Sequence, residues 1–237
     1  STEFLFQHTL DLSAKLELNS SQKENREKLL SQKEKVIVQY QNVSLKVSKL
    51  RIQTAKTFAQ ETTNIIQQLG LGKAQFLVNI THNPEASINK LGQDICTFEV
   101  IMNPGQAPQA MSKTASGGEL SRIALAIEIC KKQEDQSSSF VFDEVDAGIG
   151  GAVAETVGKL MRKLSLTQQV FAVTHLPHVA GLSHQHYLVS KQEVVGLTES
   201  SVNLLNQEQR IQELARMLGG STITETTLEQ AKAFMLD

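Results

Sequence analysis

Three segments in the second half of the chain hold residues whose types and spacing suit the chemistry of nucleotide hydrolysis. They are residues 114–129 (TASGGELSRIALAIEI), 139–151 (SFVFDEVDAGIGG) and 169–175 (QVFAVTH). The first offers a glycine-containing loop, the second a pair of carboxylates and the third a histidine. Each of these groups also has an ordinary structural explanation, and only their combination indicates a function.

The glycine-containing loop is Ser116-Gly117-Gly118, which lies just before Glu119 and an apolar run of helical period. Backbone N–H groups at the start of a helix lack partners, and glycines let the main chain approach a phosphate closely. The alternative is an ordinary capping box, in which the side chains of Ser116 and Glu119 satisfy the helix start. The sequence leaves both explanations open.

The carboxylate pair follows a short apolar run. Residues 140–142 are apolar and lead directly into Asp143 and Glu144, as in a buried parallel strand that ends at a ligand crevice. One carboxylate can hold Mg²⁺, directly or through water, and the next can orient an attacking water. A solvated acidic turn is the alternative, but the turn at residues 148–151 favours the functional interpretation.

A second strand pattern ends in a histidine. Residues 170–173 are apolar and are followed by Thr174 and His175. At the carboxyl end of a parallel strand, this imidazole would face the same crevice and could donate a hydrogen bond to a terminal phosphate oxygen. A lone histidine is more often structural, so the assignment depends on the other two segments.

In this order and spacing, the three segments resemble the signature motif, Walker B strand and switch histidine of an ABC ATPase head. Together with Leu69-Gly70, Asn103-Pro104-Gly105, VTHLPHVAG and HQHYLVSK, they resemble RecN, a family of bacterial SMC-like proteins of DNA double-strand-break repair. The resemblance covers nearly all of residues 20–237. It implies an α/β fold: the C-terminal part of an ABC-type head, with a parallel sheet, flanking helices and a small antiparallel strand pair, preceded by a long coiled-coil helix.

The resemblance also implies a composite ATP site. Ser116, Gly117 and Gly118, with Glu119 beside them, would contact the γ-phosphate of ATP held by a second head. Asp143 would support Mg²⁺, directly or through water, and Glu144 would polarise the attacking water. Asp146 in the D-loop would couple the two sites, and His175 would sense the γ-phosphate.

A Walker A motif is not found in the chain. The nearest sequence is Gly72-Lys73, but Ala74 replaces the required Ser or Thr and Gln67 stands where the first Gly should be. We therefore expect a carboxyl-terminal fragment that is inactive alone as an ATPase. Its expected partners are the N-terminal half of the same protein, a second head engaged through ATP, and DNA, which comes from the resemblance alone; no membrane is expected.

Composition adds few constraints. The chain has 237 residues, with 23 basic and 25 acidic side chains and a net charge of −2, so charge gives no argument for nucleic acid. Cys96 and Cys130 lack C-x-x-C spacing, and no apolar run approaches the length of a membrane span. These features favour a reducing cytoplasm, with association to the nucleoid implied by the resemblance.

The pattern along the chain predicts a coiled-coil arm over residues 1–72 and a head lobe over 73–237. Residues 3–18 form a separate helix if Asn19-Ser20-Ser21 breaks the chain. The register slips after Thr54, where the arm enters the head. The apolar seam of the arm is Leu29, Val36, Tyr40, Val43, Val47 and Leu50.

Two other function classes stay open, since a fragment without a P-loop could be a non-catalytic dimerisation or scaffold module, or part of another ABC protein. Transporter nucleotide-binding domains carry no such arm ahead of the signature. His175, His178, His184 and His186 lack the patterned Cys or carboxylate partners that a zinc site usually has. The head lobe is expected to begin with a strand pair at 76–80 and 96–102. Further strands are expected at 139–143, 169–174 and 186–190, and helices at 117–133, 150–164, after Pro177, at 208–218 and from 224.

Overall fold

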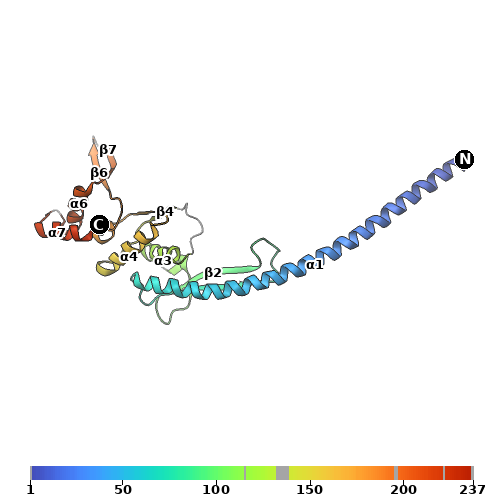
Figure 1. Ribbon diagram of the computed structural model, residues 1–237, viewed down its shortest axis with the longest axis horizontal. Helices are drawn as coiled ribbons and strands as arrows, with labels where there is room; N and C mark the ends of the chain where they lie inside the picture. The colour runs from blue at the N-terminus through green and yellow to red at the C-terminus, as the bar shows by residue number, and fades with distance from the viewer. Residues whose placement is uncertain (1, 115, 132–138, 195–196, 221, 236–237) are drawn as a thin grey trace. The chain divides into compact units, whose positions relative to one another are not determined.

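The computed structural model describes residues 2–114, 116–131, 139–194, 197–220 and 222–235 (Figure 1). These residues fall into two compact units. The first comprises residues 1–54 and 80–96, and the second comprises residues 55–79 and 97–237. Helix α1 and strands β1 and β2 contribute to both units, so contacts divide the chain within these elements. The predicted boundary at residue 72 stays a prediction.

Helix α1 runs without interruption from Thr2–Gln68, as the blue-to-cyan ribbon of Figure 1 shows. The break considered at Asn19-Ser20-Ser21 is therefore wrong. The hydroxyl of Ser20 donates to the carbonyl of Glu17 over 2.9 Å, a bond that satisfies the serine side chain inside the helix. The helix contains no Gly or Pro to interrupt its backbone hydrogen bonds.

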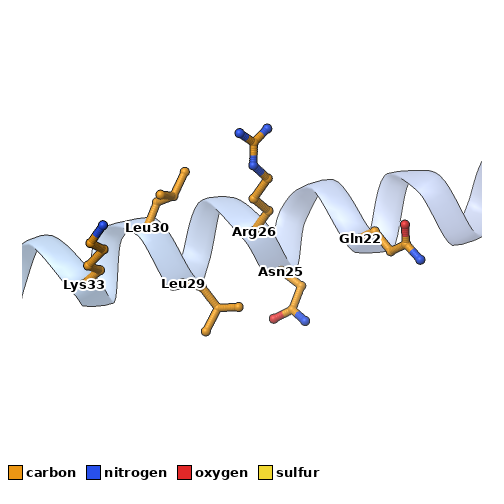
Figure 2. Close-up of a pocket in the computed structure, with 6 residues that line it drawn as sticks. All are labelled: Gln22, Asn25, Arg26, Leu29, Leu30 and Lys33. Atoms are coloured by element: carbon orange, nitrogen blue, oxygen red, sulfur yellow. The ribbon is translucent and has the colours of Figure 1, made fainter.

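The predicted seam of the arm is mostly exposed in this single chain. The side chain of Leu29 is 56% exposed, and Val36, Val43 and Leu50 are exposed to a similar degree. Figure 2 shows Leu29 and Leu30 pointing away from the helix in different directions, each beside polar residues of the neighbouring turn. All six residues drawn there belong to α1. The shallow pocket that they line is therefore a groove on the surface of one helix. Pairing of α1 into a coiled coil stays a prediction.

In the first unit, a buried carboxylate joins α1 to the strand pair. Asp94 accepts hydrogen bonds from Arg51 at 2.8 Å and contacts His82 Nδ1 at 2.9 Å. Burial raises the pKa of Asp94, but the hydrogen bonds from Arg51, His82 and Ser48 outweigh it and leave the pKa below its ordinary value. Ser48 is itself buried on the same side of α1.

Strands β1 (Gln75–His82) and β2 (Asp94–Ile101) are neighbours in a sheet whose third strand is β3 (Gln109–Ala110). The side chains of Asn79 and Glu99 meet, as do those of His82 and Asp94, so β1 and β2 run in opposite directions. The predicted strand pair is thus confirmed, with a loop between the strands. A short helix, α2 (Met111–Thr114), follows β3.

The main core lies in the second unit. Strands β4 (Ser139–Phe142) and β5 (Gln169–Ala172) pair in parallel, and helices α3 (Gly117–Cys130) and α4 (Gly151–Leu164) pack with them. Each fully buried Leu, Ile or Phe contributes roughly 1.5–3 kcal/mol. The fully buried large apolar side chains of this core are Ile66, Leu69, Phe76, Val100, Ile123, Leu125, Val145, Val157 and Leu164.

One strand of the carboxyl-terminal part is not as predicted. Beyond α5 (Pro177–Ala180), strand β6 (Tyr187–Val194) pairs antiparallel with β7 (Leu197–Leu204) as a hairpin. The sequence predicted β6 but not β7. Strand β7 reads LTESSVNL, and its many polar residues hide the strand pattern.

The last two helices begin where the sequence indicates. Helix α6 (Gln207–Gly219) starts at a capping box of Asn206 and Gln209, and α7 (Glu225–Phe234) starts at one of Thr224 and Thr227. Within the described residues, no helix is both long enough and apolar enough to span a bilayer. A second small core joins α5, α6 and α7 through the buried residues Ala180, Leu214, Ala215 and Ala231.

Candidate nucleotide site

The turn that follows β4 carries the two predicted carboxylates. Asp143 and Glu144 are both exposed, and the Oδ1 atom of Asp143 accepts a hydrogen bond from the amide of Glu144 at 2.9 Å. The backbone φ angle of Glu144 is +55°, and among the described non-glycine residues it alone has a positive φ. This left-handed conformation costs on the order of 1–2 kcal/mol for a residue with a side chain. The acidic turn therefore stores backbone strain at the residue expected to activate water.

The signature loop forms a complete capping box at the start of α3. The amide of Ser116 donates to Glu119 Oε2 at 2.8 Å, and the amide of Glu119 donates to Ser116 Oγ at 3.4 Å. The structural alternative for these two residues is thus present. It leaves the amides of Gly117 and Gly118 directed along the N-terminal end of α3, where the helix dipole favours an anion.

Both glycines of the loop lie against the acidic turn. A Cβ atom built on Gly118 would lie 2.7 Å from the carbonyl oxygen of Glu144 and 2.9 Å from Cβ of Ala147. A Cβ atom on Gly117 would collide with the carboxylate of Glu144. Glycine is therefore required at Gly118 by backbone packing within this chain, independently of any nucleotide.

Two polar side chains of α3 hold the same turn. Ser121 Oγ donates to the carbonyl of Asp143 at 2.7 Å. Nη1 of the buried Arg122 donates to the carbonyls of Val145 at 3.2 Å and Ala147 at 3.0 Å. Sequence reasoning missed both residues. They lie in SGGELSR, about one helical turn after the glycines, and both side chains reach the acidic turn from α3.

Asp146 connects the acidic turn to the end of β5. Asp146 is only 3% exposed. Its Oδ2 atom accepts hydrogen bonds from the hydroxyl of Thr174 at 2.5 Å and from the backbone amide of His175 at 3.0 Å. The same oxygen lies 3.3 Å from Nδ1 of His175. The imidazole is 72% exposed, so most of the ring faces solvent. Thr174 is a further residue that sequence reasoning did not single out.

The structure brings all of the predicted site residues to one edge, the carboxyl ends of β4 and β5. Strand β4 ends at Phe142, and the amide of Val173 bonds to its carbonyl at 3.0 Å, so the two strand ends are adjacent. Asp146 faces inward to His175. Its expected role in coupling two heads stays a prediction.

The remaining histidines lie elsewhere. His178 packs against the ring of Phe234, and Nδ1 of His184 lies 3.4 Å from Ser165 Oγ. Burial and the nearby Arg210 lower the pKa of His186, which favours its neutral form. Across the described ranges, no group of three or more His, Cys, Asp or Glu side chains could hold a metal ion.

The nearest approach to a Walker A sequence has the wrong local structure. Gly72 and Lys73 form a turn between α1 and β1, whereas a P-loop joins a strand to a following helix. This turn is held by the amide of Ala74, which bonds to the carbonyl of Leu71 at 2.9 Å.

Comparison with curated proteins finds relatives that are DNA repair proteins. The chain is 42% identical over 234 residues to the DNA repair protein RecN of Vibrio cholerae, covering 99% of this chain and 42% of the relative. It is 41% identical over 214 residues to RecN of Haemophilus influenzae, covering 90% of this chain and 38% of the relative. The chain thus spans about two fifths of the length of these relatives. No family model matches. The resemblance to RecN is confirmed.

Comparison with solved structures supports the fold. An Smc head domain with an extended coiled coil from Pyrococcus furiosus matches with a TM-score of 0.54 at 21% identity, over 83% of this chain and 46% of that chain. An Smc head domain with a coiled coil and joint from Pyrococcus yayanosii matches with a TM-score of 0.55 at 22% identity, over 81% and 35%. The chain therefore has the α/β fold of an SMC head portion with a long helix, as the sequence predicts.

Proposed function

We propose that this chain is the carboxyl-terminal part of a RecN-type, SMC-like ATPase that acts in DNA double-strand-break repair and recombination. The observation that carries the proposal is the shared edge at which Asp143, Glu144 and His175 meet the glycine loop of α3. Similarity to RecN over nearly the whole chain supports the same conclusion. The proposed substrate is ATP with Mg²⁺.

Asp143 fits a role in holding Mg²⁺. Its exposed carboxylate offers the hard oxygen ligand that this cation prefers. Oδ1 accepts a hydrogen bond from the amide of Glu144, so Oδ2 is the oxygen that would bind the cation. Mg²⁺ would supply charge neutralisation for the phosphates, directly or through water.

Glu144 and His175 would act on the water and the γ-phosphate. The exposed carboxylate of Glu144 can accept a proton from a water positioned for in-line attack. With the Asp146 carboxylate beside Nδ1, the Nε2 atom of His175 would donate to a γ-phosphate oxygen from the doubly protonated imidazolium, whose Nδ1–H Asp146 would accept. Asp146 would thus act first on its own histidine, in addition to the coupling role expected for the D-loop.

The phosphates would be held by a Walker A lobe that this sequence does not contain. Exposed apolar side chains on the paired strands support such a lobe: Val141 of β4 is 70% exposed and its partner Phe171 of β5 is 47% exposed, while Val173, directly after β5, is 60% exposed. We propose that the N-terminal half of the same protein covers these side chains. Two complete heads would then close on ATP, each with the Ser116-Gly117-Gly118 loop facing the nucleotide of the other, and this motion would act on DNA in the cytoplasm at the nucleoid.

A non-catalytic dimerisation or scaffold module is the alternative function. The complete capping box of Ser116 and Glu119 favours it, because the box gives this loop a structural purpose without a nucleotide.

Reconstitution with a Walker A lobe tests the proposal. The purified chain alone should hydrolyse ATP negligibly, because it has no residues to cradle the β-phosphate. The protein that also carries a Walker A lobe should hydrolyse ATP, and linear DNA should alter the rate. ATP hydrolysis by the chain alone at the rate of the complete protein, or no hydrolysis by the complete protein with DNA, would refute it.

A further inference from the structure

Arg122 is a buried cation that lies beside the proposed catalytic centre without touching it. The residue is 4% exposed and belongs to α3, whose N-terminal end carries the Ser116-Gly117-Gly118 loop. Burial lowers its pKa, and the nearby carboxylates of Glu119 and Asp146 partly offset that effect. An arginine keeps its charge even so, which means that the protein has placed a desolvated positive charge here.

The turn that Arg122 contacts is the strained one. The Nη1 atom of Arg122 donates to two backbone carbonyls of this turn. Val145 directly follows Glu144, and Ala147 directly follows Asp146. A strained backbone conformation persists only when its surroundings hold it in place. The guanidinium provides two such bonds from one atom, and hydrogen bonds from a charged donor are about twice as strong as neutral ones.

We propose that Arg122 is a positioning residue that holds Glu144 in its left-handed conformation and couples it to the signature helix. The inference rests on the proposed ATPase function. Because Arg122 extends from α3 to the acidic turn, a displacement of the signature loop by nucleotide would be transmitted to Glu144 through this side chain. Arg122 would therefore affect the rate of the chemical step rather than the affinity for ATP.

The matched control is Arg210. It also has a pKa lowered by burial, and its Nη2 atom donates to a backbone carbonyl, that of Ser183, at 2.8 Å. It is on α6 and bonds to the segment between α5 and β6. The change Arg210→Met therefore removes a partly buried cation and similar hydrogen bonds to backbone carbonyls from a part of the fold that the proposal does not involve.

The experiment measures ATP hydrolysis, ATP affinity and thermal unfolding in the protein that carries a Walker A lobe. Arg122→Met should lower kcat by about 10²-fold, since displacement of a catalytic group by about 1 Å costs that much, with ATP affinity unchanged within about threefold. Arg210→Met should lower the Tm similarly but change kcat by less than about threefold. In Arg122→Lys, the positively charged ammonium can still donate to a carbonyl, so this variant should recover about tenfold of the lost kcat.

A double-mutant cycle with Glu144→Gln then separates positioning from general damage. If Arg122 acts through Glu144, adding Arg122→Met to Glu144→Gln should slow single-turnover hydrolysis by less than about threefold further. Full additivity of the two losses, or an equal loss of kcat in Arg210→Met, would overturn the inference while leaving the ATPase function intact.

Two results distinguish the remaining cases. If Glu144→Gln alone hydrolyses ATP at the wild-type rate, the role proposed for Glu144 has failed and this inference fails with it, whereas the ATPase function stands; if the unmutated protein with a Walker A lobe does not hydrolyse ATP, the proposed function itself has failed. If Arg122→Met does not fold, Arg122→Lys carries the test: a kcat about tenfold below wild type, with less than about threefold further loss when Glu144→Gln is added, supports the inference, and a kcat at the wild-type level overturns it.

Discussion

Glu144 is the one described residue with a side chain whose backbone φ angle is positive. Its φ of +55° is accompanied by a hydrogen bond from its amide to Oδ1 of Asp143 and by close packing of Gly118 on its carbonyl. Strained residues cluster at functional sites because a fold tolerates the cost only where something is gained. This supports a catalytic role for Glu144 over a solvated acidic turn.

We predict that Glu144→Gln slows single-turnover ATP hydrolysis by about 10²-fold or more in the protein with a Walker A lobe, because an amide keeps the shape but cannot take a proton from water. ATP binding and head association should be retained. Rapid-quench measurements alongside nucleotide titration check this. Hydrolysis at the wild-type rate would contradict the assignment.

The two glycines of the signature loop should differ in their effects on stability. Gly118→Ala places a methyl group against the backbone of Glu144, so we predict a loss of about 1–3 kcal/mol in the free energy of unfolding. Gly117→Ala meets only the movable carboxylate of Glu144 and should change stability little. Denaturant unfolding of the two variants, compared side by side, checks the order. Equal losses would show that this packing is wrong.

At the scale of elements, the contact of α1 with the strand pair depends on the charge of Asp94. The pKa of Asp94 lies below its ordinary value of 3.8 in the folded chain, so this carboxylate stabilises the fold above about pH 4. The stabilisation is lost as the pH falls through the lowered pKa. Below that pH the carboxyl is protonated in both the folded and unfolded states.

Asp94→Asn should therefore lower the free energy of unfolding near pH 6 by on the order of 1–3 kcal/mol, and the difference from wild type should shrink below pH 4. Hydrogen exchange of the α1 amides at residues 40–54, in the Asp94→Asn variant and in the wild type, measures this difference in free energy at each pH. Glu27→Gln, which removes an exposed charge on the same helix, is the control. A difference that stays constant from pH 6 to pH 3 would argue against this linkage.

Elements with local signals were predictable, and those without them were not. Asn206 and Thr224 mark the starts of α6 and α7 because capping is a local interaction. Strand β7 was missed because it has few apolar residues to form a strand pattern, and because pairing with β6 stabilises it. The serine at position 20 was misleading, since its side chain bonds back within the helix rather than ending it.

The site residues were predictable as a set but not in their mutual contacts. Motif spacing placed Ser116, Glu144 and His175 on one edge, because carboxyl ends of parallel strands meet there. The bonds of Arg122 to the acidic turn and of Asp146 to His175 join segments 23 to 29 residues apart in sequence. Such contacts depend on the packed fold and carry no local sequence signal.

At the scale of the whole molecule, the main question is whether the signature loop works within its own head or on the nucleotide of another. In this chain Gly117 lies against Glu144 of the same chain, which is compatible with action in one head. The proposed composite site instead requires Ser116 to reach a second head. Ser116 suits the test because, among the described residues, its side chain bonds to Glu119 and not to Glu144.

Mixing two inactive variants tests the composite site most directly. One variant carries Ser116→Arg, and the other carries a disabled Walker A motif in the lobe that completes the head. In a mixed dimer, one of the two sites regains an intact Walker A, Glu144 and signature loop, so an equal mixture should recover about a quarter of the wild-type ATPase rate. If cross-linking shows that mixed dimers form but no ATP hydrolysis returns, the signature loop does not act across the interface and the composite site is contradicted.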